Sequence, residues 1–166
     1  MPRPFARADV AVYAALAGVK FVLHAATAGG YGMFRDEFYY LACADRLDWG
    51  YVDHPPLSIW LLAATRALFG DGLFAVRLPA AFAAALVVVG SGLLARRMGG
   101  DRFAQALAMA AVIACPMLLG VHNYYSMNTL DHLFWVAAAL LLLRLIDGGE
   151  PRTWIALGVV CGLGLL

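Results

Sequence analysis

The sequence predicts an all-α protein that crosses a membrane several times, and three features support this fold class. Hydrophobic residues make up 63% of the chain and charged residues 14%, whereas soluble proteins average roughly 45–50% and about 25%. The mean hydropathy is correspondingly high, at +0.77. Most charges lie between long apolar runs and few lie within them, which is typical of membrane-spanning helices. These features give no support to nucleic-acid binding.

The first apolar run, at residues 10–29, is long enough to cross a hydrocarbon core of about 30 Å as a helix. A cleaved signal peptide is the alternative, because residues 26–28 (Ala-Thr-Ala) resemble a small-residue cleavage site. Lys20 and His24 interrupt the run, however, and its length exceeds the usual signal core of about 7–15 residues. We therefore interpret it as a retained span.

Residues 30–73 contain no uncharged stretch of the about 18 residues that a spanning helix needs. Two helical patterns occur in this region, at residues 36–47 and 56–69. Pro56 suits the first turn of the second helix, and Gly70 is expected to end it. We expect both to be interfacial helices, lying along the membrane surface in an outer loop.

Further apolar runs predict helices that return through the membrane, at residues 74–95, 103–121, 130–146 and 154–166. Pro116 should kink the 103–121 helix near its far end. The last run has only about 13 residues, which is roughly 20 Å of helix, so it stops short of crossing. The chain is thus expected to hold four complete spans and one incomplete span.

The arginines predict which end of the spans faces the cytoplasm. If the spans alternate in direction, one side collects most of the arginines at helix ends, namely Arg3, Arg7, Arg96, Arg97, Arg102, Arg144 and Arg152. The positive-inside rule makes this side cytoplasmic, together with the N-terminus. The outer loop and the polar break at residues 122–129 then face the periplasm or exterior, as in a multi-pass protein of the cell membrane.

Several short motifs carry a resemblance to a known family. They are Asp36-Glu37, Tyr39-Tyr40, Gly50-Tyr51-Val52-Asp53-His54-Pro55-Pro56-Leu57, and Arg77-Leu78-Pro79. Together they resemble the N-terminal part of the dolichyl-phosphate-mannose-protein mannosyltransferase-like glycosyltransferases, which include aminoarabinose transferases. The resemblance implies that residues 1–166 are the N-terminal part of a helical transmembrane bundle of the GT-C type. It also implies an enzyme that transfers a sugar, with inversion, from a polyprenyl-phosphate carrier to an extracytoplasmic lipid, glycan or protein.

The same resemblance implies roles for individual residues. Asp36 falls on the expected catalytic base, and Glu37 stands beside it as the second member of the catalytic pair. Tyr40 and His54 fall in tyrosine-rich and His-Pro-Pro segments, which are expected to contact substrate. Asp131 falls on a further acidic position at the outer start of a span, where it is also expected to contact substrate.

The residues themselves leave two interpretations open for these acids. A carboxylate at the membrane surface can take the proton of an acceptor hydroxyl, and such assistance is worth about 10²–10⁴-fold. Asp36 and Glu37 could instead stabilise a helix N-terminus, where acids gain about 0.3–1 kcal/mol from the helix dipole. Asp131 could likewise cap the helix of the fourth span, and Asn128 or Thr129 could do so equally well.

Acids from two outer segments also allow a metal site. Glu37 and Asp131 are the candidate ligands of a divalent cation that would bridge to the carrier phosphate, with His54 or His122 as further ligands. No pair among these residues has a diagnostic local spacing, and the three cysteines form no CxxC pair. A lone histidine in such a place is more often a hydrogen-bonded interfacial residue.

Two cations complete the candidate substrate-binding residues. Arg77 lies near the outer boundary of the second span, where its guanidinium could hold a phosphate by bidentate hydrogen bonds; an interfacial anchor is the alternative. Lys20 lies near the middle of the first span, where a cation costs roughly 2.5–3.5 kcal/mol. It either contacts substrate, or it snorkels to the surface or pairs with an acid on another span.

A non-enzymatic membrane protein is the competing function. A transporter or channel fragment would place ionisable residues deep in several spans, and here these are few, chiefly Lys20 and His24. A structural subunit would dock a partner on its surface helices and would not need the acids Asp36 and Asp131. The enzyme, in contrast, needs a polyprenyl-phosphate sugar, the surrounding membrane lipids and an extracytoplasmic acceptor as partners.

Overall fold

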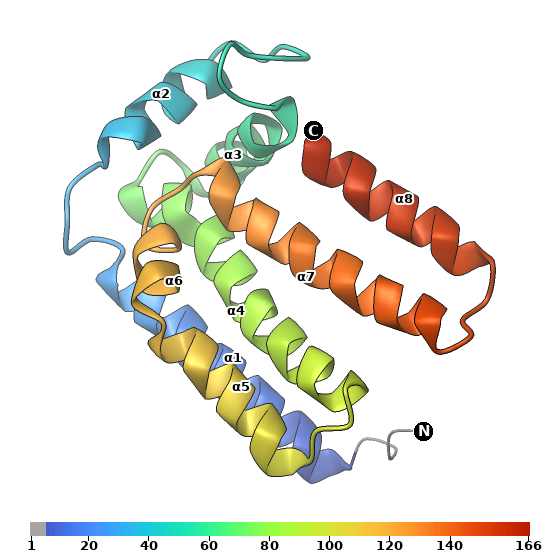
Figure 1. Cartoon of the computed structure of the whole chain (residues 1–166). Helices are drawn as coiled ribbons and strands as arrows, with labels where there is room; N and C mark the ends of the chain where they lie inside the picture. Colours follow the sequence, from blue (N-terminus) through green and yellow to red (C-terminus); the bar gives the residue numbers. More distant parts are fainter. Residues whose placement is uncertain (1–5) are drawn as a thin grey trace.

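The computed structural model describes residues 6–166 (Figure 1), so Arg3 lies outside the described residues. Within this part of the chain all regular structure is helical, which confirms the predicted fold class. In chain order the helices are α1 (Arg7–Thr27), α2 (Arg35–Ala44), α3 (Pro56–Phe69), α4 (Leu73–Arg97), α5 (Arg102–Ala114), α6 (Pro116–Val121), α7 (Met127–Ile146) and α8 (Arg152–Leu165).

Helix α4 is the centre of the bundle and packs against α1, α5 and α7 (Figure 1). Two glycines of α4 allow this close approach. A Cβ atom on Gly90 would clash with a methyl carbon of Val136 in α7, and one on Gly92 would lie 2.9 Å from the Tyr13 ring of α1. Because small residues let membrane helices approach closely, this packing orders the bundle around α4.

Three helices in the described part, α1, α4 and α7, are long and apolar enough to cross a membrane. The protein is therefore a multi-pass membrane protein. The expected continuous span at residues 103–121 is wrong in detail, because α5 ends at Ala114, Cys115 is extended, and Pro116 begins α6. Proline lacks an N–H group and disfavours a helical residue before it, so Pro116 breaks the helix where the sequence predicted a kink.

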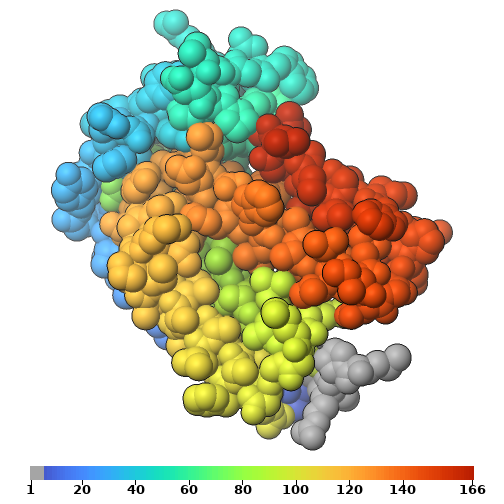
Figure 2. All heavy atoms as spheres, viewed as in Figure 1, coloured from blue at the N-terminus to red at the C-terminus, as the bar shows by residue number. Residues whose placement is uncertain are grey.

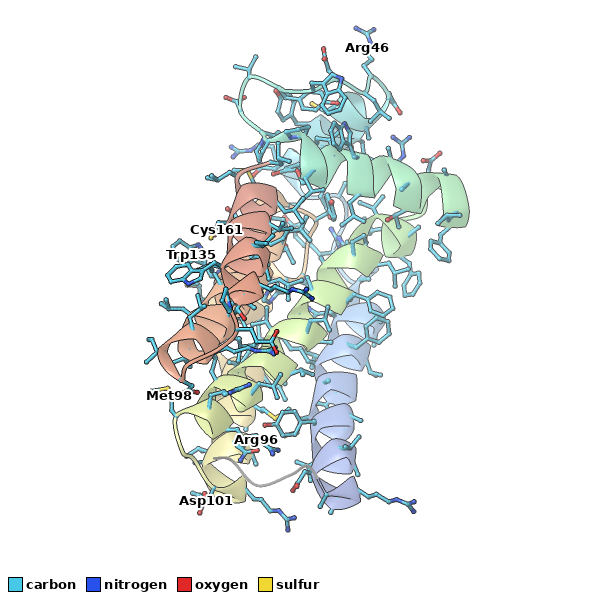
Figure 3. The ribbon with its side chains drawn as sticks, turned by 90° about the vertical axis from the view of Figure 1, so that its right-hand side faces the viewer. Arg46, Arg96, Met98, Asp101, Trp135 and Cys161 are labelled. Carbon is cyan, nitrogen blue, oxygen red and sulfur yellow. The ribbon has the colours of Figure 1, made fainter. Side chains whose placement is uncertain are left out.

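The helices alternate in direction and gather arginines at one end of the bundle. Figure 3 places Arg96 near this end, opposite Arg46. Ion pairs join neighbouring helix ends there: Asp9 lies 2.6 Å from Arg102, and Arg97 lies 3.5 Å from Asp147. The predicted segregation of arginine is thus present in three dimensions. The membrane face to which this end belongs stays a prediction.

Helices α2 and α3 cover the opposite end, which we call the α2–α3 end (Figure 2). Helix α3 has the bounds that the sequence predicts, with Pro56 in its first turn and Gly70 in a left-handed conformation (φ 84°) after its last residue. Helix α2 ends at Ala44, three residues before the predicted end at residue 47. Their placement along a membrane surface stays a prediction.

The start of α7 differs from the expectation. The helix begins at Met127 and not at residue 130, with Ser126 in the N-cap position. The backbone N–H of Met127 donates to the Tyr40 hydroxyl at 2.9 Å, so a tyrosine from α2 satisfies a group that local capping residues usually satisfy. The suggestion that Asn128, Thr129 or Asp131 caps this helix is therefore wrong.

Candidate functional site

A buried ion pair joins α2 to α4 beneath the α2–α3 end. The Arg77 side chain is 3% exposed and that of Glu37 is 0% exposed. Arg77 Nε donates to Glu37 Oε1 at 2.8 Å, and Arg77 Nη2 donates to Glu37 Oε2 at 2.7 Å. The remaining guanidinium hydrogens meet backbone carbonyls that follow α1, those of Ala28, Tyr31 and Gly32.

These contacts use all five N–H donors that an arginine has. A phosphate could bind Arg77 only by displacing the carboxylate or the carbonyls from a buried place. The expectation that Arg77 holds the carrier phosphate therefore does not fit this geometry. Its role is to fix the chain after α1, and helix α2, on the end of α4.

The carboxylate of Glu37 is equally occupied. Besides the two bonds from Arg77, Oε2 accepts the N–H of Phe34 at 2.8 Å, and Oε1 accepts the N–H of Tyr125 at 2.9 Å. Burial raises the pKa of Glu37, but the hydrogen bonds from Arg77 and from the two backbone N–H groups outweigh it, so the pKa lies below its ordinary value of 4.5. Glu37 is thus a carboxylate that fastens three segments together.

No oxygen of Glu37 is left to bind a metal ion. Across residues 6–166, moreover, no group of three or more His, Cys, Asp or Glu side chains is arranged to hold one. The residues expected to form a metal site, Glu37 with Asp131, therefore do not fit a metal, and we derive no step of the chemistry through one.

Two buried tyrosines extend this framework. Tyr40 is 2% exposed and Tyr125 is 0% exposed, and their rings meet edge to face at 5.7 Å. The Tyr125 hydroxyl donates to the carbonyl of Ser58 in α3, while the Tyr40 hydroxyl accepts from Met127. Burial raises the pKa of the Tyr40 hydroxyl. Tyr40 was expected to contact substrate, but the structure gives it a buried, positioning role.

His54 lies against the rings of Tyr40 and Tyr39, at centroid distances of 4.2 Å and 4.9 Å. Neither of its ring nitrogens has a hydrogen-bond partner. Burial lowers the pKa of His54, and the nearby carboxylates of Asp53 and Asp36 oppose this effect only in part. Stacking therefore fixes an imidazole with unused polar atoms close to Asp36.

Asp36 precedes Glu37 in α2 and has the opposite environment. Its side chain is 44% exposed, and it pairs with Arg35, whose side chain is 89% exposed. Consecutive residues of a helix point about 100° apart, so burying Glu37 turns Asp36 outward. Of the expected catalytic pair, Asp36 is therefore the exposed member and Glu37 the buried one.

Asp131 lies in the second turn of α7, also at the α2–α3 end. It lines a cavity of about 260 Å³ together with Pro55, Ser58 and Asn128, among other residues. The cavity thus adjoins the His54-Pro55 segment. Asp131 is exposed, and its contact with substrate stays a prediction.

Lys20 is fully buried, with 0% exposure, and no acid among the described residues pairs with it. The expected ion pair with another span is therefore absent from the described part. His24 and His122 lie near its ammonium group instead, as described below. His24, one helical turn after Lys20, was the signal for this group in the sequence, but His132 could not be placed beside it from spacing alone.

The fold and this arrangement define a multi-span helical membrane protein with an acidic site at one end of its bundle. A family model described as dolichyl-phosphate-mannose-protein mannosyltransferase matches residues 53–166. The chain belongs to this family, which confirms the family that the motifs predicted. The match includes His54, Arg77 and Asp131, and it begins after Asp36.

Curated relatives are similar over 70% of this chain. The undecaprenyl phosphate-alpha-4-amino-4-deoxy-L-arabinose arabinosyl transferase 1 of Pseudomonas fluorescens Pf-5 is 33% identical over 121 residues. The undecaprenyl phosphate-alpha-4-amino-4-deoxy-L-arabinose arabinosyl transferase of Pseudomonas aeruginosa UCBPP-PA14 is 36% identical over 121 residues. The match covers 22% of each of these relatives. No solved structure matches the chain.

Proposed function

We propose that the protein containing this chain is a membrane glycosyltransferase. It takes a sugar from a polyprenyl-phosphate carrier and transfers it, with inversion, to an extracytoplasmic lipid, glycan or protein. Family membership supports the reaction class, and the relatives' names, which specify an undecaprenyl-phosphate-linked aminoarabinose, support the class of donor. A transporter fragment or structural subunit has no comparable support.

The observation that carries this proposal is the opposite placement of two adjacent acids. Glu37 is buried and saturated with hydrogen bonds, whereas Asp36 is half-exposed on the same helix. A general base must come within hydrogen-bonding reach of the acceptor hydroxyl. Asp36 can do this on a helix that Glu37 and Arg77 hold in place.

The reaction that follows is a single displacement. The Asp36 carboxylate takes the proton of the acceptor hydroxyl while the acceptor oxygen forms a bond to the anomeric carbon of the sugar. The bond from that carbon to the carrier's phosphate oxygen breaks, and its electron pair leaves with the phosphate. Attack from the side opposite the phosphate inverts the anomeric configuration.

Two further side chains are placed to contact the substrates. His54 has free ring nitrogens beside Asp36, and stacking on Tyr40 fixes its orientation. Asp131 lines the neighbouring cavity. We assign His54 and Asp131 to substrate binding, and Tyr40 to positioning His54.

The test is a transfer assay with membranes from cells that express the protein from its own gene. Labelled undecaprenyl-phosphate sugar serves as the donor. Asp36→Asn keeps the side-chain shape and should lower turnover by about 10²-fold or more, with normal membrane insertion. Asp45→Asn, on the same surface but paired with Arg66, is the matched control and should stay close to wild type.

The proposal for Asp36 fails if Asp36→Asn transfers sugar at the wild-type rate. The enzymatic proposal itself fails if the wild-type protein, correctly inserted, transfers no labelled sugar from any polyprenyl-phosphate donor tried.

A further inference from the structure

Four basic side chains meet inside the bundle, away from Asp36. Lys20 and His24 come from α1, His122 follows α6, and His132 comes from α7. Lys20, His24 and His122 are 0%, 4% and 1% exposed. The His24 and His122 rings lie 6.0 Å apart, and the His122 and His132 rings lie 5.4 Å apart. We call these residues the basic group.

Several polar atoms of the basic group lack partners. Lys20 Nζ, His122 Nε2 and His132 Nδ1 are buried without a hydrogen bond, and the His24 ring has only Asn123 beside it as a polar neighbour. Buried polar groups in proteins nearly always have a partner, and a buried unpaired charge is especially unfavourable. Several such atoms at one place indicate a binding site whose ligand is not part of this chain.

The charges around the basic group indicate the sign of that ligand. None of the ion pairs among residues 6–166 brings an Asp or Glu to Lys20. Three histidines could suggest a metal, but their geometry does not hold one, and the ammonium of Lys20 would repel a cation. An oxyanion, in contrast, would accept hydrogen bonds from the ammonium of Lys20 and from imidazole N–H groups.

A cavity gives such an anion a place next to the basic group. It measures about 440 Å³, and His24 forms part of its wall. Thr27 and Asn123 add polar atoms, while Leu23 and Leu119 add apolar surface from α1 and α6. The cavity therefore combines apolar walls with a polar side that includes His24, one member of the basic group.

We propose that Lys20, His24, His122 and His132 form a buried phosphate-binding site, entered from the cavity that His24 lines. The phosphate belongs either to a lipid carrier, whose chain fits the apolar walls, or to free phosphate. The first case rests on the proposed function, and the second does not. In both cases the phosphate oxygens supply the acceptors that these side chains lack.

The test measures binding to the purified protein in uncharged detergent. Sodium phosphate is titrated against sodium chloride at equal ionic strength, and undecaprenyl phosphate is titrated in a separate series. At least one of the two should raise the melting temperature of the wild type. Lys20→Met has a similar length without the charge and should weaken the apparent affinity about tenfold or more. Arg46→Met, which removes an exposed cation, should bind like the wild type.

A second variant keeps the test decisive if Lys20→Met does not fold. His122 Nδ1 lies 2.8 Å from the Leu118 carbonyl, and the amide of Asn can replace that contact. His122→Asn therefore removes only the unpaired Nε2, and it should weaken phosphate binding several-fold. A response to lipid phosphate alone assigns the site to the carrier, and a response to sodium phosphate as well shows that the phosphate group suffices.

The inference is overturned if neither phosphate stabilises the wild type, or if Lys20→Met and His122→Asn bind like the wild type. The transfer assay separates this result from the proposed function. If sugar transfer is active and both variants bind phosphate like the wild type, the phosphate site is rejected and the proposed enzymatic function stands. If phosphate binding depends on Lys20 but the wild-type protein transfers no sugar, the phosphate site stands and the proposed enzymatic function is rejected.

Discussion

Glu37 and Arg77 are 40 residues apart in the sequence, and they pair through two parallel hydrogen bonds in the interior of the protein. The same carboxylate accepts the N–H of Tyr125, from the segment that leads into α7. One acid thus holds together α2, α4 and the start of α7. The pair also determines the direction of Asp36, because the two acids are neighbours on one helix.

Replacing Arg77 by Lys should destabilise the protein strongly. Lysine keeps the charge but loses the planar fork, so a single ammonium must serve five acceptors that are mostly buried. We expect the free energy of unfolding to fall by about 3–5 kcal/mol, as when a buried pair is broken. Denaturant unfolding in detergent measures this change.

Arg66→Lys is the matched control for Arg77→Lys. Arg66 also bridges two carboxylates, those of Asp45 and Asp71, but both acids are exposed. Exposed pairs contribute about 0–1 kcal/mol, so this variant should stay near the wild type. Equal losses in the two variants would contradict the structural role of the Glu37–Arg77 pair.

The contribution of Glu37 to stability should depend on pH. Its pKa in the folded protein lies below the ordinary value of 4.5, so the folded state favours the ionised form. The contribution is then fully present above pH 4.5 and is lost as the pH falls through the lowered folded-state pKa. The stability difference between the wild type and Glu37→Gln should be constant near neutral pH and should shrink in acid. A difference that does not change on acidification would contradict an ionised Glu37.

Tyr40→Phe tests how α2 supports the start of α7. The variant keeps the ring that stacks on His54 but leaves the buried N–H of Met127 without its acceptor. An unsatisfied buried donor costs about 1–3 kcal/mol, and the Met127 amide should exchange with solvent faster. Tyr39→Phe, on the exposed side of His54, should change stability by less than about 0.5 kcal/mol. Similar behaviour of the two variants would reject the role given to the Tyr40 hydroxyl.

The orientation in the membrane is tested by labelling single cysteines. Cys43, Cys115 and Cys161 are first replaced by Ala. Asp48→Cys, at the α2–α3 end, should then react with a membrane-impermeant thiol reagent in intact cells. Met98→Cys, an exposed position at the arginine-rich end (Figure 3), should react only after lysis. The reverse pattern would place the α2–α3 end in the cytoplasm.

The sequence by itself determined the helical class, the family and the approximate course of the chain. These depend on local properties, because apolar runs, arginines and short motifs are readable without knowing the packing. The bounds of α3 illustrate this, since Pro56 and Gly70 act on their own backbone. The sequence also predicts the two adjacent acids as a catalytic pair, and this role stays a prediction.

Tertiary structure decided which acid is exposed and which cations have partners. Glu37, Arg77 and Tyr125 meet because α2 is turned toward α4 by a rotation that sequence spacing does not specify. Likewise, Lys20 lies near His122 and not near an acid, and His122 in turn lies against His132 of α7. The pairing of charged side chains depends on such contacts between distant segments of the chain. It can therefore be read only from the packed helices.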